Sequence, residues 1–112
     1  MKNYIQPGGS LTVAAPYDRL SGQGCLVGAL FGVCVTDALN GANVSINTIG
    51  VYELAKAGAQ AWTVGAKVYW DNAAKACTTV AAGNTLIGCA AAAVGNGDGE
   101  TLGQVRLNGV VA

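Results

Sequence analysis

Four cysteines are the strongest nucleophiles in the chain, and the sequence contains no histidine that could activate them. They are Cys25, Cys34, Cys77 and Cys89. Without histidine the commonest general base is absent, and every His-based catalytic triad is excluded. No CxxC pair is present, so the usual spacing of zinc ligands is missing too. Each cysteine stands among Val, Leu, Ala or Gly, which predicts reduced, buried thiols that pack as small hydrophobic side chains.

Glycine spacing invites a comparison with phosphate-binding loops. Residues 83–88 have the two glycines of such a loop at the right separation, but Cys89 stands where the motif requires lysine. That lysine must reach the phosphates, so an ATPase or a recombinase is excluded. The glycines between residues 22 and 28 miss the dinucleotide-binding spacing, and no βαβ pattern surrounds them. Both groups are typical of strands and tight turns.

The acidic residues also form no recognisable catalytic or metal-binding motif. The nearest acidic pair in the sequence, Asp98 and Glu100, lies on a glycine-rich turn without the ligand series of an EF-hand. No SxxK or GxSxG motif is present either. We therefore predict that the protein is not an enzyme and needs no cofactor and no metal ion.

Charge is sparse and balanced, with six basic and six acidic residues that make up 11% of the chain. No basic stripe is present, so we predict no sequence-specific contact with nucleic acid. Trp62 and Trp70 could stack on bases or sugars, but packing in a core or a subunit interface is the favoured interpretation. A surface with so few charges promotes association, which favours a chain packed against neighbours.

No stretch of the chain has the features of a targeting or membrane segment. The first residues lack the apolar region of a signal peptide, and no apolar run approaches a membrane span. We expect the protein to be made in a cytoplasm and to make no membrane contact. Disulfides are then disfavoured by the reducing compartment.

Short runs with strand character recur along the chain, each followed by turn residues. The strand signals cover residues 11–14, 25–28, 31–35, 43–47, 50–54, 67–71, 75–79, 86–90 and 104–108. A kink at Gly50 joins 43–47 to 50–54, which gives about seven or eight strands. Residues 55–61 are expected to form a loop or one helical turn. No internal repeat is recognised.

Alternation within three of these runs identifies the expected core. It directs Val44 and Ile46 inward, and likewise Val68 with Trp70 and Val105 with Leu107. We predict an all-β fold: a small single-domain β-barrel or β-sandwich over residues 11–112, preceded by an extended N-terminal arm, residues 1–10. The residues expected to pack in the core or an interface are Trp62, Val68, Trp70, Val105 and Leu107.

Several segments, in their order along the chain, resemble the capsid cement proteins of tailed bacteriophages. The matching segments are Asn3-Tyr4-Ile5-Gln6-Pro7-Gly8, Leu11-Thr12-Val13-x-Ala15-Pro16, Ser21-Gly22, Leu26-Val27-Gly28-x-Leu30-Phe31-Gly32-Val33, Gly50-Val51-Tyr52-Glu53-Leu54-x-Lys56-Ala57, Ala61-Trp62-x-x-Gly65-x-Lys67-Val68-Tyr69-Trp70-Asp71, Gly83-Asn84-x-Leu86-Ile87-Gly88 and Val105-Arg106-Leu107-Asn108-Gly109. The Val-Tyr-Trp-Asp and Val-Arg-Leu-Asn-Gly pieces are the most specific. Ala66 departs from the family, which tends to carry Asp there.

The resemblance implies a decoration protein on the exterior of the virion. It would bind the phage major capsid protein as a homotrimer near three-fold positions and stabilise the lattice. We hypothesise that the arm adds a strand to the capsid protein. The candidate capsid-binding residues are Lys2, Asn3, Tyr4, Ile5, Gln6 and Pro7. Two alternatives remain: a phage surface or tail module that recognises carbohydrate through Trp62 or Trp70, and a small enzyme with a cysteine nucleophile.

Overall fold

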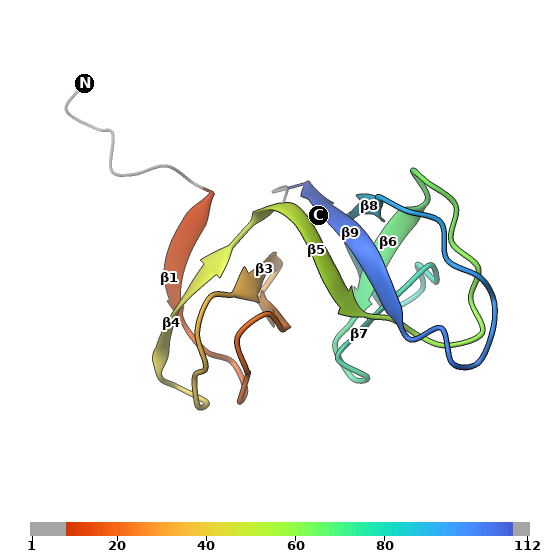
Figure 1. Cartoon of the computed structure of the whole chain (residues 1–112). Coiled ribbons are helices and arrows are strands. Elements are labelled where there is room, and N and C mark those ends of the chain that lie inside the picture. Colours follow the sequence, from red (N-terminus) through yellow and green to blue (C-terminus); the bar gives the residue numbers. More distant parts are fainter. Residues whose placement is uncertain (1–8, 109–112) are drawn as a thin grey trace, which may run out of the picture.

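Alternating runs of apolar and polar residues form nine strands in the computed structural model, which describes residues 9–108 (Figure 1). The strands are β1 (Ser10–Ala14), β2 (Gly24–Val27), β3 (Leu30–Cys34), β4 (Asn43–Asn47), β5 (Ile49–Ala55), β6 (Lys67–Asp71), β7 (Ala76–Thr78), β8 (Thr85–Ala90) and β9 (Leu102–Asn108). The all-β prediction is confirmed. The described residues contain no helix, so none could span a bilayer.

The stretch expected to be one strand kinked at Gly50 is in fact two strands in different sheets. β4 ends at Asn47 and β5 begins at Ile49, with the buried Thr48 between them. Gly50 has a φ of 113°, a conformation that side chains rarely adopt. The chain turns here out of the first sheet and into the second, which accounts for the additional strand.

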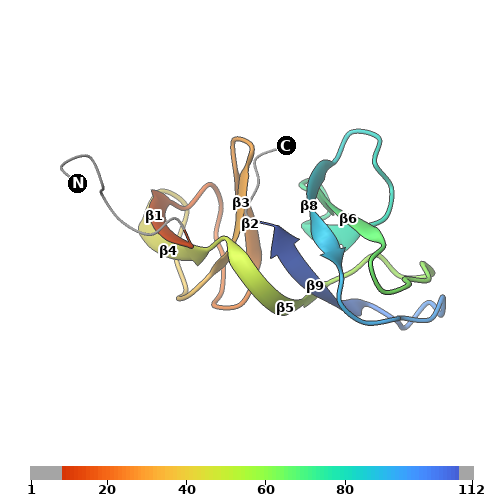
Figure 2. The same ribbon diagram turned by 90° about the horizontal axis from the view of Figure 1, so that it is seen from above.

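The first sheet has the order β1-β4-β3-β2, with every neighbouring pair antiparallel. Consecutive strands are not always neighbours, because β4 inserts between β1 and β3. The second sheet has the order β5-β9-β8-β6-β7, also antiparallel. Figure 2 shows the two sheets side by side, with β4 leading directly into β5.

The second sheet curls into a half-barrel, and the chain just after its edge strand β5 reaches the other edge strand, β7. Lys56, the residue after β5, forms a parallel bridge with Cys77 of β7. The Ala57 amide also donates to the Cys77 carbonyl at 2.9 Å. A shift of register between Val68 and Tyr69 in β6 supports the bend, since bulges increase local twist.

The core has one large part and one small part, and β3 contributes to both. In the large part, Phe31 of β3 packs on Trp70 of β6 with ring centroids 4.9 Å apart, which joins the two sheets. In the small part, Cys25 and Cys34 pack with Ile46 inside the first sheet. Because both faces of β3 are covered, its residues from Phe31 to Cys34 are all buried.

Two glycines allow backbones and rings to approach closely. A Cβ on Gly88 of β8 would stand 1.9 Å from the carbonyl oxygen of Arg106 on β9. A Cβ on Gly103 would stand 2.4 Å from the ring of Trp62. Neither position can carry a side chain without movement of the backbone or of a buried indole.

Candidate functional site

The residues expected to bind the capsid, Lys2 to Pro7, lie outside the described residues. The structure does define where the chain that follows them enters the fold. The carbonyl of Gly9 accepts a hydrogen bond from the Thr48 amide at 2.9 Å, and β1 begins at Ser10. The proposed arm therefore leads directly into a strand of the first sheet.

β1 is an edge strand. Within residues 9–108 it pairs with β4 alone, from Ser10 opposite Asn47 to Ala14 opposite Asn43. Ser10, Thr12 and Ala14 are exposed, whereas Leu11 and Val13 pack against the smaller part of the core. An edge strand presents main-chain donors and acceptors that a strand from another protein can pair with.

The five residues expected to pack in a core or an interface all lie in the large core of the monomer. Trp62, Val68, Trp70, Val105 and Leu107 are at most 3% exposed. Both indoles are therefore covered by this chain and present no ring face to a sugar. The carbohydrate alternative loses the aromatic surface on which it depended.

A buried lysine that no sequence motif marks as functional lies against one of these indoles. Lys56 is 3% exposed, and its Nζ lies 5.5 Å from the ring centroid of Trp62. The Nζ donates to the carbonyls of Ala57 at 2.8 Å and of Glu100 at 3.1 Å. The ammonium group thus fastens the loop before β9 to the end of β5. Nothing in its sequence neighbourhood indicates burial.

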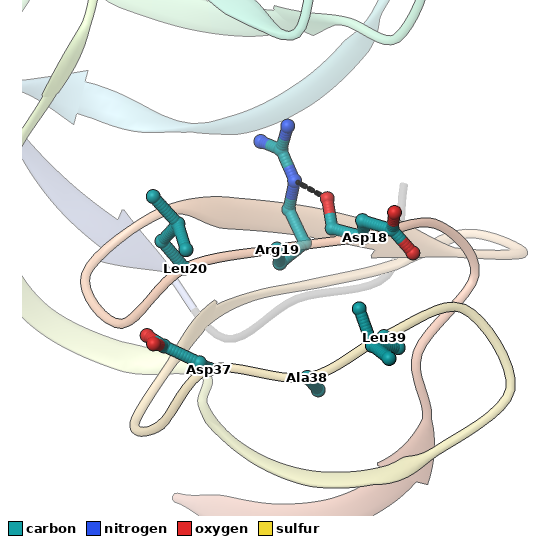
Figure 3. Close-up of a pocket in the computed structure, with 6 residues that line it drawn as sticks. All are labelled: Asp18, Arg19, Leu20, Asp37, Ala38 and Leu39. Carbon is teal, nitrogen blue, oxygen red and sulfur yellow. Dashed lines mark hydrogen bonds between the residues drawn. The ribbon is translucent and has the colours of Figure 1, made fainter.

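Two segments with the pattern Asp-x-Leu-x-Gly face each other at one end of the first sheet, residues 18–22 and 37–41 (Figure 3). Their second residues form an antiparallel bridge: the Arg19 amide donates to the Ala38 carbonyl and the Ala38 amide donates to the Arg19 carbonyl, both at 2.9 Å. The two segments are therefore related by an approximate two-fold axis.

The carboxylates of the two segments are exchanged between them. Asp18 Oδ1 accepts a hydrogen bond from the Asn40 amide, and Asp37 Oδ1 accepts one from the Ser21 amide, each at 2.7 Å. Each aspartate thus closes the turn of the opposite segment. Both carboxylates have structural partners, which explains why this residue type recurs here.

The internal symmetry extends into the strands. The β1–β4 pair and the β3–β2 pair have the same register when residue numbers are shifted by nineteen. Ala14 then corresponds to Val33, and its partner Asn43 corresponds to Gly24, the partner of Val33. The two turn glycines, at positions 22 and 41, have φ values of 85° and 87°. The expectation of no internal repeat is therefore wrong. Only three of the five motif positions are identical, but their equal spacing was the signal that could have revealed the repeat.

An open pocket of about 420 Å³ lies over this crossing. Leu20 and Leu39 stand at it with 59% and 72% of their surface exposed. Figure 3 shows both leucines beside the two aspartates. The residue types fit apolar contact with another molecule, because both leucines are exposed there and each aspartate already accepts a main-chain hydrogen bond. Within residues 9–108, no group of three His, Cys, Asp or Glu side chains could hold a metal ion.

The cysteines lie where strands pack, not at the pocket. Cys25, Cys34 and Cys77 are buried, Cys89 is half-buried, and all four are free thiols. Burial raises the pKa of Cys25 and of Cys77 to about 12. Since the thiolate is the nucleophile, neither thiol is reactive at neutral pH. The alternative of a cysteine-dependent enzyme receives no support at these two positions.

Comparison with known proteins decides the family. A family model for phage cement proteins matches residues 5–107. The chain belongs to the phage cement protein family. The match spans both sheets of the fold and confirms the resemblance seen in the sequence. The search of curated proteins and the search of solved structures each found no match. Membership implies a capsid-associated structural protein, which fits the absence of catalytic motifs in the sequence.

Proposed function

We propose that this cement protein is a non-enzymatic subunit that binds the outer surface of a tailed-phage head and stabilises the lattice of the major capsid protein. Family membership over residues 5–107 is the observation that carries the proposal. The subunit acts as a trimer at three-fold or quasi-three-fold positions. It is made in the bacterial cytoplasm and resides on the virion exterior.

The proposed anchor is the N-terminal arm, with Lys2 to Pro7 in contact with an edge or a loop of the capsid protein. An added strand gains affinity from main-chain hydrogen bonds and specificity from alternate side chains, here Tyr4 and Ile5. The position of β1 supports this arrangement. Because β1 is an edge strand, Gly9 and Ser10 lie at the rim of a sheet and not in its centre.

The outer face of the half-barrel supports the proposed trimer. Ile49 and Val51 on β5 are each 55% exposed, and so is Leu102 of β9. Leu102 lies opposite Ala55, which shares a face of β5 with the other two residues. The same face carries Glu53, Gln104 and Arg106, and a surface that mixes exposed apolar and polar side chains fits a contact between subunits. A subunit contact there would cover them.

Deletion of residues 2–7 tests the anchor. This deletion keeps Gly9, whose carbonyl is bonded to the Thr48 amide, so the urea midpoint should match that of the full chain. The truncated protein should no longer sediment with expanded, empty heads. A variant with residues 2–7 scrambled controls for length and composition. Full binding of the truncated protein would rule out the arm as anchor.

Sedimentation velocity at micromolar concentration tests the trimer. The full chain should sediment as a trimer, and Val51→Lys should convert it to a folded monomer, because the charge would be buried in the contact. Val80→Lys is the matched control, since Val80 is 52% exposed and lies in a loop outside β5 and β9. A monomeric full chain would contradict assembly before capsid binding.

A further inference from the structure

A second pocket, of about 260 Å³, lies between the two sheets and is lined by two cations. Arg19 comes from the segment before β2, and Lys75 comes from the turn between β6 and β7. The main chain of residues 21–24 forms part of the wall, and Glu53 is the acidic residue that lines the pocket. Two of the few charged side chains in this protein thus meet in one place.

Tyr17 holds the two cations close together. The guanidinium carbon of Arg19 lies 5.0 Å from the centroid of the Tyr17 ring, and the Nζ of Lys75 lies 4.2 Å from the same centroid. The guanidinium carbon of Arg19 and the Nζ of Lys75 can therefore be no farther apart than these two distances added together. Burial raises the pKa of the Tyr17 hydroxyl above its usual value of 10, so the phenol carries no negative charge near neutral pH.

A hydrogen-bond network fixes the ring that the cations share. The Tyr17 hydroxyl accepts from the Leu26 amide at 3.0 Å and donates to Asn72 Oδ1 at 2.9 Å. Asn72 Oδ1 also accepts from Trp70 Nε1 at 3.1 Å. The ring is thus bonded to β2 of the first sheet and to the turn after β6 of the second, which holds it in place between the two sheets.

The cations retain donors and lack an acidic partner. Arg19 donates from Nε to the Asp18 carbonyl at 2.8 Å and from a terminal nitrogen to the Gly24 carbonyl at 3.3 Å. Lys75 donates to the carbonyl of Asn72. Within residues 9–108 these hydrogen bonds go only to main-chain carbonyls, and no carboxylate, Glu53 included, forms a salt bridge with either cation. Two such cations in one pocket repel each other unless an anion joins them.

The backbone at Lys75 is itself unusual. Its φ is 54°, in the left-handed region that favours Gly or Asn. The turn would accept either of those residues at lower conformational cost, yet the chain places a lysine there. In this conformation the side chain lies over Tyr17. A conformation that costs energy and delivers a charge to a pocket is typical of a binding site.

We propose that this pocket binds an oxyanion between Arg19 and Lys75. The ligand is either an acidic side chain of a neighbouring protein or free inorganic phosphate, which share the same chemistry. The guanidinium group offers a planar pair of N–H donors and the ammonium group a second charge, and both form charge-assisted hydrogen bonds with oxyanions. The site is independent of the arm, and it borders the proposed trimer face, since Leu102 lines both.

Titration of the isolated, ¹⁵N-labelled protein at low ionic strength tests the site. Two probes are used separately: inorganic phosphate, and a capped tripeptide Gly-Glu-Gly. The protein contains two indole N–H reporters. Trp70 lines the pocket and is bonded to Asn72, whereas Trp62 does not line the pocket. The Trp70 indole signal should move in a saturable way while that of Trp62 stays in place.

Lys75→Asn is the decisive variant, because Asn tolerates the left-handed conformation and removes the charge. It should fold with an unchanged or higher urea midpoint and weaken anion binding about threefold to tenfold. Arg19→Gln should weaken binding similarly. Lys67→Gln is the control, since Lys67 is exposed on β6 and does not line the pocket. It should leave binding unchanged.

Each outcome has a defined meaning. A response to phosphate alone assigns the site to a free ion, and a response to the tripeptide alone assigns it to an acidic side chain. Either result supports the oxyanion site. No saturable response to either probe, or equal weakening by the Lys67→Gln control, overturns the proposal. Because no capsid is used, failure here leaves the cement function untouched.

Discussion

Asp18 and Asp37 exchange their carboxylates across an approximate two-fold axis that the first sheet contains within one chain. Each accepts a main-chain hydrogen bond at 2.7 Å from the turn of the opposite segment. Both turns are therefore closed by a carboxylate from the other segment. The four strands of the first sheet are held in register by this crossing as well as by their ladders.

Replacing Asp37 with Ala should destabilise the protein by about 1–2 kcal/mol, because the Ser21 amide loses a charge-assisted hydrogen bond. Urea unfolding measures the free energy of unfolding. Asp37→Asn keeps an acceptor and should lose less than half as much. Asp98→Ala, in the exposed loop before β9, should change stability by less than about 0.5 kcal/mol. Equal stability of the Asp37→Ala protein and the parent would contradict the role of the exchange.

Adding one methyl group at Gly88 should destabilise the fold by about 3 kcal/mol or more, because its Cβ would overlap the Arg106 carbonyl at 1.9 Å. The pair of strands β8 and β9 would have to separate at this point. Thermal unfolding is the measurement. Gly99→Ala is the matched control, since nothing lies within 4 Å of a Cβ there. A Gly88→Ala protein that melts with the control would refute the close approach.

Lys56→Met should loosen one loop more than it destabilises the whole protein. Met fills similar space, but the Glu100 carbonyl loses its bond to Nζ. The segment before β9 should then open more often. Hydrogen exchange of the Ala59 amide, which donates to the Gly97 carbonyl at 3.1 Å, should become faster. Amides of the first sheet provide the internal control, and uniform acceleration everywhere would indicate global destabilisation instead.

Stability should fall at alkaline pH. Burial raises the pKa of Cys25 and of Cys77 from 9.0 to about 12. Below pH 9 the thiols are protonated in both the folded and the unfolded chain, so they add no pH dependence. Between pH 9 and 12 only the unfolded chain loses the protons, and the free energy of unfolding decreases by up to about 1.4 kcal/mol per pH unit for each thiol.

Urea unfolding with a phosphine reductant, from about pH 7 to about pH 10.5, measures this alkaline loss. Cys77→Ala should lower stability at neutral pH but flatten the decrease above the ordinary thiol pKa, because one titrating group is gone. An identical alkaline slope in this variant and the parent would show that Cys77 does not titrate as its burial requires.

Much of the fold was readable from local pattern. Alternation identified β4, β6 and β9 and placed Val68, Trp70, Val105 and Leu107 inward, where the structure has them. It did so because one face of each strand is covered and the other is not. The pairing of β1 with β4, and the transfer of the chain between sheets at Thr48, depend on contacts between distant residues. No local pattern encodes those.

The candidate sites divide in the same way. The sequence by itself determined that the usual catalytic machinery is missing and that the chain resembles cement proteins, since both follow from residue identities and their order. Only the tertiary structure decided that Lys56 is buried, that Asp18 and Asp37 exchange hydrogen bonds, and that Arg19 and Lys75 share one tyrosine ring. The physical reason is that burial and charge proximity are properties of the packed sheets, and residues far apart in sequence acquire them only when those sheets meet.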